Sequence, residues 1–194
     1  LLNAVSDVKG DRDTTVYAKW IEKTDLGFTD VADNSPFRAA IGWAVKEGIT
    51  NGTSATTFSP GNTCTTAQIL TFLWRANGSP NSNAACPASD VAETSPFYKA
   101  LCWANEKDLM TKGSGSTPCT RAAAVTYLWK LAGSPKMSVN SSFTDVPASA
   151  DFAQAVAWAV EQGVTNGVSA SEFAPDSTCT RGQIVTFLYR NLLD

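Results

Sequence analysis

The sequence predicts an all-α protein built from three tandem helix–loop–helix units that pack about a pseudo-threefold axis, with a short β-like segment at the N-terminus. Three observations lead to this fold class. Several residue types recur at matched spacings along the 194 residues. Each recurrence contains apolar residues at helical spacing. A unit of about 45 residues buries too little apolar surface to fold alone, so we expect the units to share one core.

The repeat is defined by four groups of residues whose members lie 55 and 60 positions apart. These groups are Trp43, Trp103 and Trp158; Asp30, Asp90 and Asp145; Cys64, Cys119 and Cys179; and Arg75, Lys130 and Arg190. The middle unit is five residues shorter, and the missing residues fall between its Trp and its Cys. The units are therefore predicted at about 26–78, 88–133 and 141–194, within one domain over 26–194.

An extended entry and a first helix open each unit. Ser35 is the predicted N-cap, because a serine hydroxyl accepts a hydrogen bond from a free backbone N–H of the first turn. Pro36 is the predicted first helical residue, because proline has no backbone N–H that would need a partner there. Ser95 and Pro96 repeat this pair in the second unit. The apolar stripe of the first unit's helix consists of Phe37, Ala40, Ile41 and Ala44. The glycines predicted to turn left-handed after the first helix are Gly48 and Gly163.

A loop with an Asn-Gly turn and an F-x-P segment leads to the second helix, and the middle unit lacks the F-x-P segment. The second helix starts with a T-x-x-Q capping box at Thr65 and Gln68 and again at Thr180 and Gln183. In the middle unit Ala123 cannot return the second bond of the box. The buried stripes of these helices are Ile69, Phe72 and Leu73, and Ile184, Phe187 and Leu188.

Composition excludes several classes of function. Apolar residues make up 43% of the chain and charged residues 17%, which is typical of a folded protein. The net charge of −3 argues against nucleic-acid binding, and no apolar run is long enough to insert into a membrane. The chain has no His, so it has no Ser-His-Asp triad and no imidazole zinc site. We expect no enzyme activity, cofactor or metal, because the acids recur as repeat elements or lie at variable surface positions.

The five cysteines divide into two sets. Cys64, Cys119 and Cys179 are equivalent in the repeat and are predicted to be small buried apolar residues. Cys86 and Cys102 belong to the middle unit or its linker, and a disulfide between them is left open. The chain starts without Met, so we expect it to be part of a longer protein that carries other domains.

The repeat elements are, in order, F-x-D-V, an aromatic-rich helix, G-I-T-x-G, F-x-P and a T-R-A-E-like helix start. This pattern resembles the S-layer homology (SLH) domain family. The resemblance covers most of the chain, and three tandem copies are the usual arrangement. It implies a three-pronged helical spindle and a non-catalytic anchor at the cell surface. Such anchors hold proteins on Gram-positive-type walls by binding secondary cell-wall polysaccharide, which often carries pyruvate ketals.

Residues 1–25 lie outside this pattern. The alternation from Asp13 to Trp20 is of the β type, and it resembles the closing strand of a Listeria–Bacteroides-type surface repeat. This segment is therefore interpreted as the remnant of a preceding β-rich repeat or linker.

The resemblance places Arg121 and Arg181 at the arginine of the T-R-A-E motif, in the first turn of the second helix. A guanidinium beside free helix N–H groups would form an anion pocket suited to a pyruvyl carboxylate. The alternative is a salt bridge between units, for instance to an F-x-D-V aspartate. Thr66 takes this position in the first unit and brings no charge. Gln68 and Gln183 replace the motif's glutamate and would bind sugar hydroxyls or cap the helix.

Three further groups are candidate carbohydrate-binding residues. The aspartates Asp30, Asp90 and Asp145 would bind sugar hydroxyls or orient the arginines, or serve only in turns. The tryptophans Trp43, Trp103 and Trp158 would stack on sugars or belong to the core. The loop glycines Gly52 and Gly167 would let the backbone approach a ligand. We expect a monomeric pseudo-trimer; the alternative function is a protein–protein module of a surface layer.

Overall fold

The computed structural model describes residues 26–139 and 142–192, and in these residues it contains six helices and no strand. The helices are α1 (Arg38–Lys46), α2 (Thr66–Ala76), α3 (Tyr98–Glu106), α4 (Arg121–Leu131), α5 (Ala153–Glu161) and α6 (Arg181–Leu192). The predicted all-α fold is confirmed. The β-like segment predicted within residues 1–25 lies outside the described residues.

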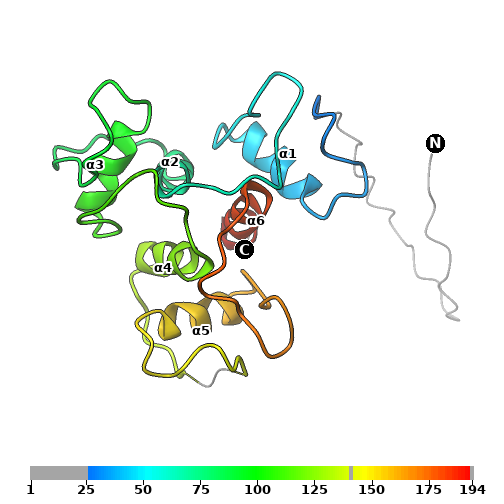
Figure 1. Ribbon diagram of the computed structural model, residues 1–194, viewed down its shortest axis with the longest axis vertical. Coiled ribbons are helices and arrows are strands. Elements are labelled where there is room, and N and C mark those ends of the chain that lie inside the picture. The colour runs from blue at the N-terminus through cyan, green and yellow to red at the C-terminus, as the bar shows by residue number, and fades with distance from the viewer. Residues whose placement is uncertain (1–25, 140–141, 193–194) are drawn as a thin grey trace, which may run out of the picture.

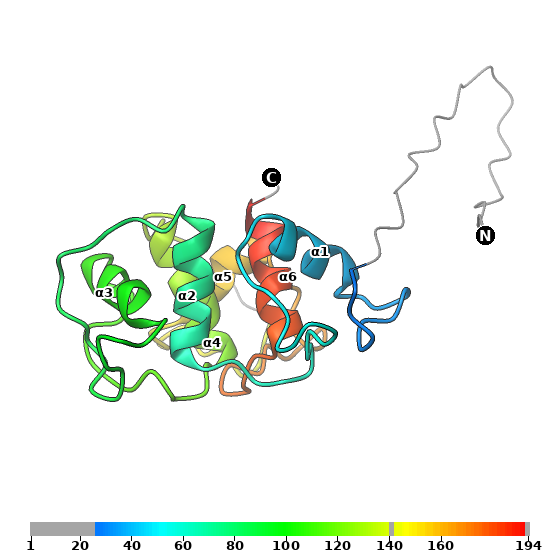
Figure 2. The same cartoon turned by 90° about the horizontal axis from the view of Figure 1, so that it is seen from above.

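The three second helices α2, α4 and α6 surround the centre of the molecule, and α1, α3 and α5 lie at the periphery (Figure 1). Figure 2 shows α3 and α1 on the opposite outer sides of α2 and α6. This arrangement gives three lobes about a central axis, as the pseudo-threefold prediction requires.

Each peripheral helix packs on the second helix of another unit. The closest helix pairs are α2 with α3, α4 with α5, and α1 with α6. The two helices of one helix–loop–helix unit are therefore not the closest pair. A helical stripe shows which face of a helix is buried but not which other stripe it meets, and the sequence pattern was equally compatible with both pairings.

The backbone of the three equivalent cysteines closes a ring on the axis. The N–H of Cys64 donates to the carbonyl of Cys179, that of Cys179 to Cys119, and that of Cys119 to Cys64, each at 2.9 Å. The three side chains are buried, as predicted, and all five cysteines are free thiols. Burial raises the pKa of Cys64 to about 11 and that of Cys179 to about 12, so these thiols stay neutral.

The predicted caps of the second helices are confirmed. Thr65 Oγ1 accepts the N–H of Gln68 at 3.3 Å, and Gln68 Oε1 accepts the N–H of Thr65 at 2.9 Å. Thr180 and Gln183 exchange the same two bonds at 3.0 and 3.3 Å. In the middle unit, only the N–H of Ala123 to the Thr120 hydroxyl is formed, at 3.2 Å. These caps fix where each central helix begins.

The predicted start of the first helix is two residues too early. α1 begins at Arg38 with Phe37 as its N-cap, and no side chain caps it. The Ser35 hydroxyl accepts the N–H of Phe37 at 3.3 Å, so Ser35 and Pro36 form a turn before the helix. Ser95 bonds to Phe97 in the same way. The predicted left-handed glycines are confirmed, with φ of 68° at Gly48 and 67° at Gly163.

The predicted stripes form the core. The buried members are Ala40, Ile41 and Ala44 from α1, Ile69, Phe72 and Leu73 from α2, and Ile184, Phe187 and Leu188 from α6. Together with residues of the middle unit they make one continuous cluster. A shared core explains why short helices, each of nine to twelve residues, are stable here.

Candidate functional site

The start of each central helix contacts the loop of a different unit, and we call these three contacts the seams. In the first seam α6 meets the loop 49–62, in the second α4 meets the loop 164–177, and in the third α2 meets residues 113–117. Two backbone hydrogen bonds of 2.8 to 3.0 Å form at each seam, and in each the helix residue donates its N–H to a loop carbonyl. The donors and acceptors are Arg181 to Asn62, Gly182 to Pro60, Arg121 to Ser177, Ala122 to Pro175, Thr66 to Thr117, and Ala67 to Gly115.

These bonds correct one part of the predicted anion pocket. The first N–H groups of the central helices are not free to hold an anion, because carbonyls of the neighbouring unit already accept them. The prediction considered one unit at a time, and the loop that satisfies these groups belongs to another unit.

Arg181 lies inside the first seam with 6% of its surface exposed. Its Nε donates to the carbonyl of Phe58 at 3.0 Å. Its Nη2 donates to the carbonyl of Asn51 at 2.8 Å and contacts the Thr50 hydroxyl at 3.4 Å. The guanidinium lies between two aromatic rings, at 4.7 Å from the centre of Phe58 and 5.5 Å from that of Phe72. Arg181 therefore fastens the loop of the first unit to helix α6 of the third.

Arg121 repeats this arrangement in the second seam and is 3% exposed. Its Nε donates to the carbonyl of Phe173 at 2.8 Å, and its Nη2 reaches the Thr165 hydroxyl at 3.5 Å. The rings on its two sides are Phe173 at 4.8 Å and Phe187 at 5.5 Å. The two arginines thus share the Phe carbonyl, the Thr hydroxyl and the two rings as equivalent partners, and Arg181 has in addition the bond to the carbonyl of Asn51.

Neither arginine forms an ion pair within the described residues. The salt bridges found there join Arg38 to Asp33, Lys107 to Glu106, and Lys130 to Asp108. The alternative of a salt bridge between units is therefore absent at both seams. Burial lowers the pKa of Arg121 and Arg181.

The three repeated aspartates hold the loops that meet the central helices. Asp30 accepts the N–H groups of Phe58 and Ser59 at 2.8 and 2.7 Å, and Asp145 accepts those of Phe173 and Ala174 at 2.9 and 2.7 Å. Asp90 accepts the N–H groups of Gly115 and Ser116 and the hydroxyl of Ser114. The turn role considered from the sequence is therefore present in all three units.

These contacts also lower the pKa of the aspartates. Desolvation raises the pKa of Asp30 and Asp145, but the backbone N–H groups outweigh it, and the net pKa lies below 3.8. At Asp90 the hydroxyls of Ser116 and Ser114 lower the pKa further. The aspartates orient the arginines only indirectly, since Asp30 positions the residue Phe58 whose carbonyl Arg181 binds.

The third seam brings together two departures from the repeat that look unrelated in the sequence. Thr66 stands in place of an arginine, and its hydroxyl donates to the carbonyl of Thr117 at 3.1 Å. In the shortened loop of the middle unit, Gly115 takes the position of Phe58 and Phe173. Asp90 therefore accepts the N–H of a glycine, where Asp30 and Asp145 accept that of a phenylalanine. Tyr127 occupies the position of Phe72 and interacts with Thr66, and burial raises its pKa to about 12. The third seam therefore lacks the arrangement of the other two, in which a guanidinium lies between two phenylalanine rings.

The loop glycines are required by the packing of their own loops. A side chain at Gly52 would collide with the carbonyls of Ser54 and Thr57 and with the ring of Phe28. At Gly167 the φ is 83°, and an added Cβ would lie 2.6 Å from Cε1 of Phe143. Approach of a ligand to these glycines stays a prediction.

The three tryptophans differ in exposure. Trp103 and Trp158 are buried in the core, with 1% and 5% of their surfaces exposed. Trp43 is half-buried, and its ring meets Tyr189 of α6 edge-on with the ring centres 5.7 Å apart. Little aromatic face remains for stacking on a sugar at Trp103 and Trp158.

The sequence interpretation missed the partners of the arginines. These are Thr50, Phe58 and Phe72 for Arg181, and Thr165, Phe173 and Phe187 for Arg121. A signal was present in the sequence. The middle unit lacks both the G-I-T and the F-x-P segments, and the helix that meets its loop, α2 of the first unit, has Thr66 in place of Arg. That link becomes visible only when the seams are known to join different units.

The sequence model of the S-layer homology domain matches residues 27–69 and 142–185. The chain carries S-layer homology domains at these two segments. A comparison with curated proteins gives no match. The matched segments correspond to the first and third units, and they include the aspartates Asp30 and Asp145 and the arginine Arg181.

S-layer homology domains are non-catalytic modules that anchor proteins at the cell wall, where they bind polysaccharide, and they occur in surface-associated proteins. In the described residues, no helix has the length and apolar character that a membrane span requires. The described residues also contain no group of three His, Cys, Asp or Glu side chains placed to hold a metal ion. The seams between the units contain the repeated arginines and aspartates, and they are the candidate site.

Proposed function

We propose that this chain anchors its protein to the cell wall by binding an anionic secondary cell-wall polysaccharide at the seams between its units. The anchoring role rests on the two S-layer homology matches. The anionic character of the ligand rests on one observation, the buried guanidiniums of Arg121 and Arg181 that lack a carboxylate partner among the described residues.

A buried cation without an anion is unfavourable, because desolvation is only partly offset by carbonyls and aromatic faces. Every buried side-chain nitrogen and oxygen in the described residues has a hydrogen-bond partner, and the bonds of both arginines use Nε and Nη2. The Nη1 atoms must therefore contact solvent. An acidic group of the polysaccharide, such as a pyruvate ketal, would bind at this edge and complete the charge pairing.

Two of the three seams suit such a ligand under this proposal. The first and second seams each offer a guanidinium, whereas Thr66 leaves the third seam neutral. We further propose that α3 and α4 form a third S-layer homology repeat, because Asp90 and Thr120 make the bonds of their equivalents. The domain would then extend over 26–194 as a monomeric pseudo-trimer.

Sedimentation with cell walls tests this function. The protein should sediment with walls that carry their polysaccharide, and the bound fraction should fall when pyruvate ketals are removed by mild acid. It should remain in solution when the polysaccharide has been stripped completely. Unchanged binding to stripped walls would instead support the alternative of a protein–protein module, and unchanged binding after ketal removal would contradict the anionic ligand.

A further inference from the structure

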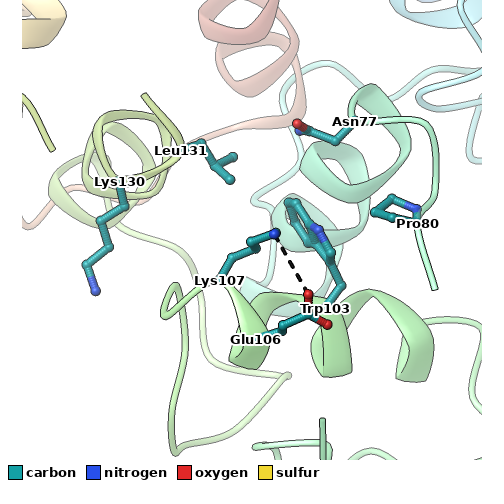
Figure 3. A pocket seen from close by; sticks show the side chains of 7 residues that line it. All are labelled: Asn77, Pro80, Trp103, Glu106, Lys107, Lys130 and Leu131. Atoms are coloured by element: carbon teal, nitrogen blue, oxygen red, sulfur yellow. Dashed lines mark ion pairs between the residues drawn. The ribbon is translucent and has the colours of Figure 1, made fainter. Parts of the chain in front are cut away.

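The two thiols of Cys86 and Cys102 lie at the joint between the first and second units. Cys86 belongs to residues 79–87, which lead from α2 towards α3 and which we call the α2–α3 linker, and Cys102 belongs to α3 itself. Figure 2 shows the chain after α2 passing around the outer side of α3. Figure 3 shows Pro80 of the linker and Trp103 of α3 at one pocket. The linker and α3 are therefore in contact.

Side-chain hydrogen bonds hold the linker against the part of α3 that carries Cys102. The Ser82 hydroxyl donates to the carbonyl of Cys102 at 3.2 Å, and Nδ2 of Asn105 donates to the carbonyl of Ala85 at 2.9 Å. Asn105 follows Cys102 by three positions, so the two residues are neighbours on the helix surface. Because Ala85 directly precedes Cys86, these bonds hold the linker thiol beside that surface.

The first unit has the same contact at the equivalent positions. Leu26 and Gly42 correspond to Cys86 and Cys102 when the repeated aspartates and tryptophans are aligned. A Cβ at Gly42 would lie 3.1 Å from Cδ2 of Leu26. The repeat therefore brings a side chain at the first of these positions onto the helix at the second. In the middle unit, both positions carry a thiol.

Access to solvent separates this pair from the other thiols. Cys86 is half-buried, whereas Cys64, Cys119 and Cys179 are at most 1% exposed. A reagent in solution therefore reaches Cys86 and does not reach the thiols on the axis while the core is closed. Burial raises the pKa of Cys102, and the Cys86 thiol raises it further. Repulsion between two thiolates requires that the sulfurs be near each other, in agreement with the contacts of the linker.

We propose that Cys86 and Cys102 are a paired modification site that a low-molecular-weight disulfide, such as oxidised glutathione, converts into an intramolecular disulfide. The thiolate of Cys86 attacks one sulfur of the reagent, forms a mixed disulfide and releases one glutathione. Cys102 then gives its proton to solvent, attacks Sγ of Cys86 and releases the second glutathione. The protein loses two hydrogens with two electrons, and the reagent gains them as two thiols.

The new bond ties the α2–α3 linker to α3 and fastens the joint between the first two units. A disulfide stabilises a protein mainly by restricting the unfolded chain, and this one closes the loop 86–102. The oxidised protein should therefore melt about 6–12 °C above the reduced protein. This effect is independent of what the seams bind.

Oxidation of the folded full chain tests the site. The reduced protein is freed of reductant and incubated with oxidised glutathione, and its intact mass should fall by about 2 Da as two hydrogens are lost. Two of the five thiols should disappear when thiols are counted after denaturation. Trypsin cleaves after Lys99, so the peptides 76–99 and 100–107 should be joined before reduction and separate after it.

Two single variants serve as controls. Cys86→Ala should show neither the loss of 2 Da nor a melting temperature that differs between oxidised and reduced samples. Cys119→Ala removes a thiol on the axis and should still give the joined peptides 76–99 and 100–107. The proposal is overturned if the wild type keeps all five thiols, if glutathione stays attached without a cross-link, if the cross-link joins other cysteines, or if the oxidised protein melts no higher than the reduced one.

Discussion

At the scale of single residues, Arg181 and Arg121 connect three parts of the chain that are far apart in sequence. Arg181 contacts Phe58 through both its carbonyl and its ring, and it also reaches Asn51 and the ring of Phe72. A planar guanidinium can donate in its plane and stack on both faces, which an ammonium group cannot do. The arginines are therefore structural connectors as well as candidate ligand contacts.

Replacing Arg181 by Ala should lower the free energy of unfolding by about 2–4 kcal/mol. The change leaves the carbonyls of Phe58 and Asn51 without donors and opens a cavity between two rings. Arg181→Lys should lose a large part of the same stability, because a lysine cannot replace the fork of donors. Urea denaturation measures both effects. The exposed Lys99→Ala variant is the control, and an equal small loss in all three variants would contradict this role.

A second residue-scale prediction concerns Gly182 in the first turn of α6. Helix propensity alone would make Gly182→Ala stabilising by about 1 kcal/mol. A Cβ at this position would lie 2.8 Å from Cγ and Cδ2 of Phe37, and overpacking costs about 1–3 kcal/mol. The variant should therefore be less stable than the wild type in thermal denaturation.

The sign should reverse when the ring is removed. In a Phe37→Ala background, the same Gly182→Ala change should raise the melting temperature, because the helix gain remains and the collision does not. A stabilising effect in the wild-type background would show that Phe37 does not pack on α6.

The pH dependence of stability also arises from single residues. Asp30, Asp90 and Asp145 have a pKa below the ordinary value of 3.8 in the folded state, because N–H groups and hydroxyls bind their carboxylates. Their stabilisation is complete above pH 3.8 and is lost as the pH falls through the lower folded pKa. The chain has no His, so the urea midpoint should be constant between pH 5 and 8.

This prediction is checked by urea titrations between pH 2.5 and 8. The midpoint should fall steeply only below about pH 4, and the fall should be smaller in an Asp145→Asn variant. A midpoint that changes between pH 5 and 8 would contradict the assignment.

At the scale of helices, the pairing of α1 with α6 brings together the first and last described helices. The ring of Trp43 in α1 meets Tyr189 in α6, whereas no close packing joins α1 to the helix α2 of its own unit. The chain is therefore closed by a contact between its most distant helices. This closure makes the units interdependent for folding.

A double-mutant cycle measures this pairing. Trp43→Ala and Tyr189→Ala should be coupled by about 0.5–1.5 kcal/mol in the free energy of unfolding. Either single change already removes the contact between the two rings, so the double variant should lose less stability than the sum of the two single variants. The control cycle combines Trp43→Ala with Trp129→Ala in α4, and its effects should add. Additive effects in the Trp43–Tyr189 cycle would mean that α1 does not pack on α6.

The sequence predicted the helices far better than their pairing. The caps at Thr65 and Thr180, the turns at Gly48 and Gly163 and the stripes depend on local chemistry, and the structure has them except at Phe37, which is partly buried and precedes α1. The partner of each stripe depends on long-range packing, which a local pattern does not encode. For the same reason the burial of Arg121 and Arg181 was missed, since the residues that cover them belong to another unit.

At the scale of the whole molecule, the pseudo-threefold symmetry is broken at one seam. A lone arginine at position 66 would face Gly115 and Tyr127 in place of two phenylalanines, and its charge would be buried without the stacking that Arg181 receives. The replacements at Thr66, Gly115 and Tyr127 thus compensate one another. The two remaining arginine seams give the molecule an asymmetric set of candidate sites.

Calorimetric titration of purified wall polysaccharide into the protein is the most direct test of the anchoring function. If the acidic groups of the polymer meet buried guanidiniums at two seams, the polymer should bind at low salt, bind more weakly after its ketals are removed, and retain part of its affinity at 0.5 M salt, because a partly buried pair is screened less than a surface pair. Absence of measurable heat with the intact polymer at low salt, under conditions where the protein is folded, would contradict the account.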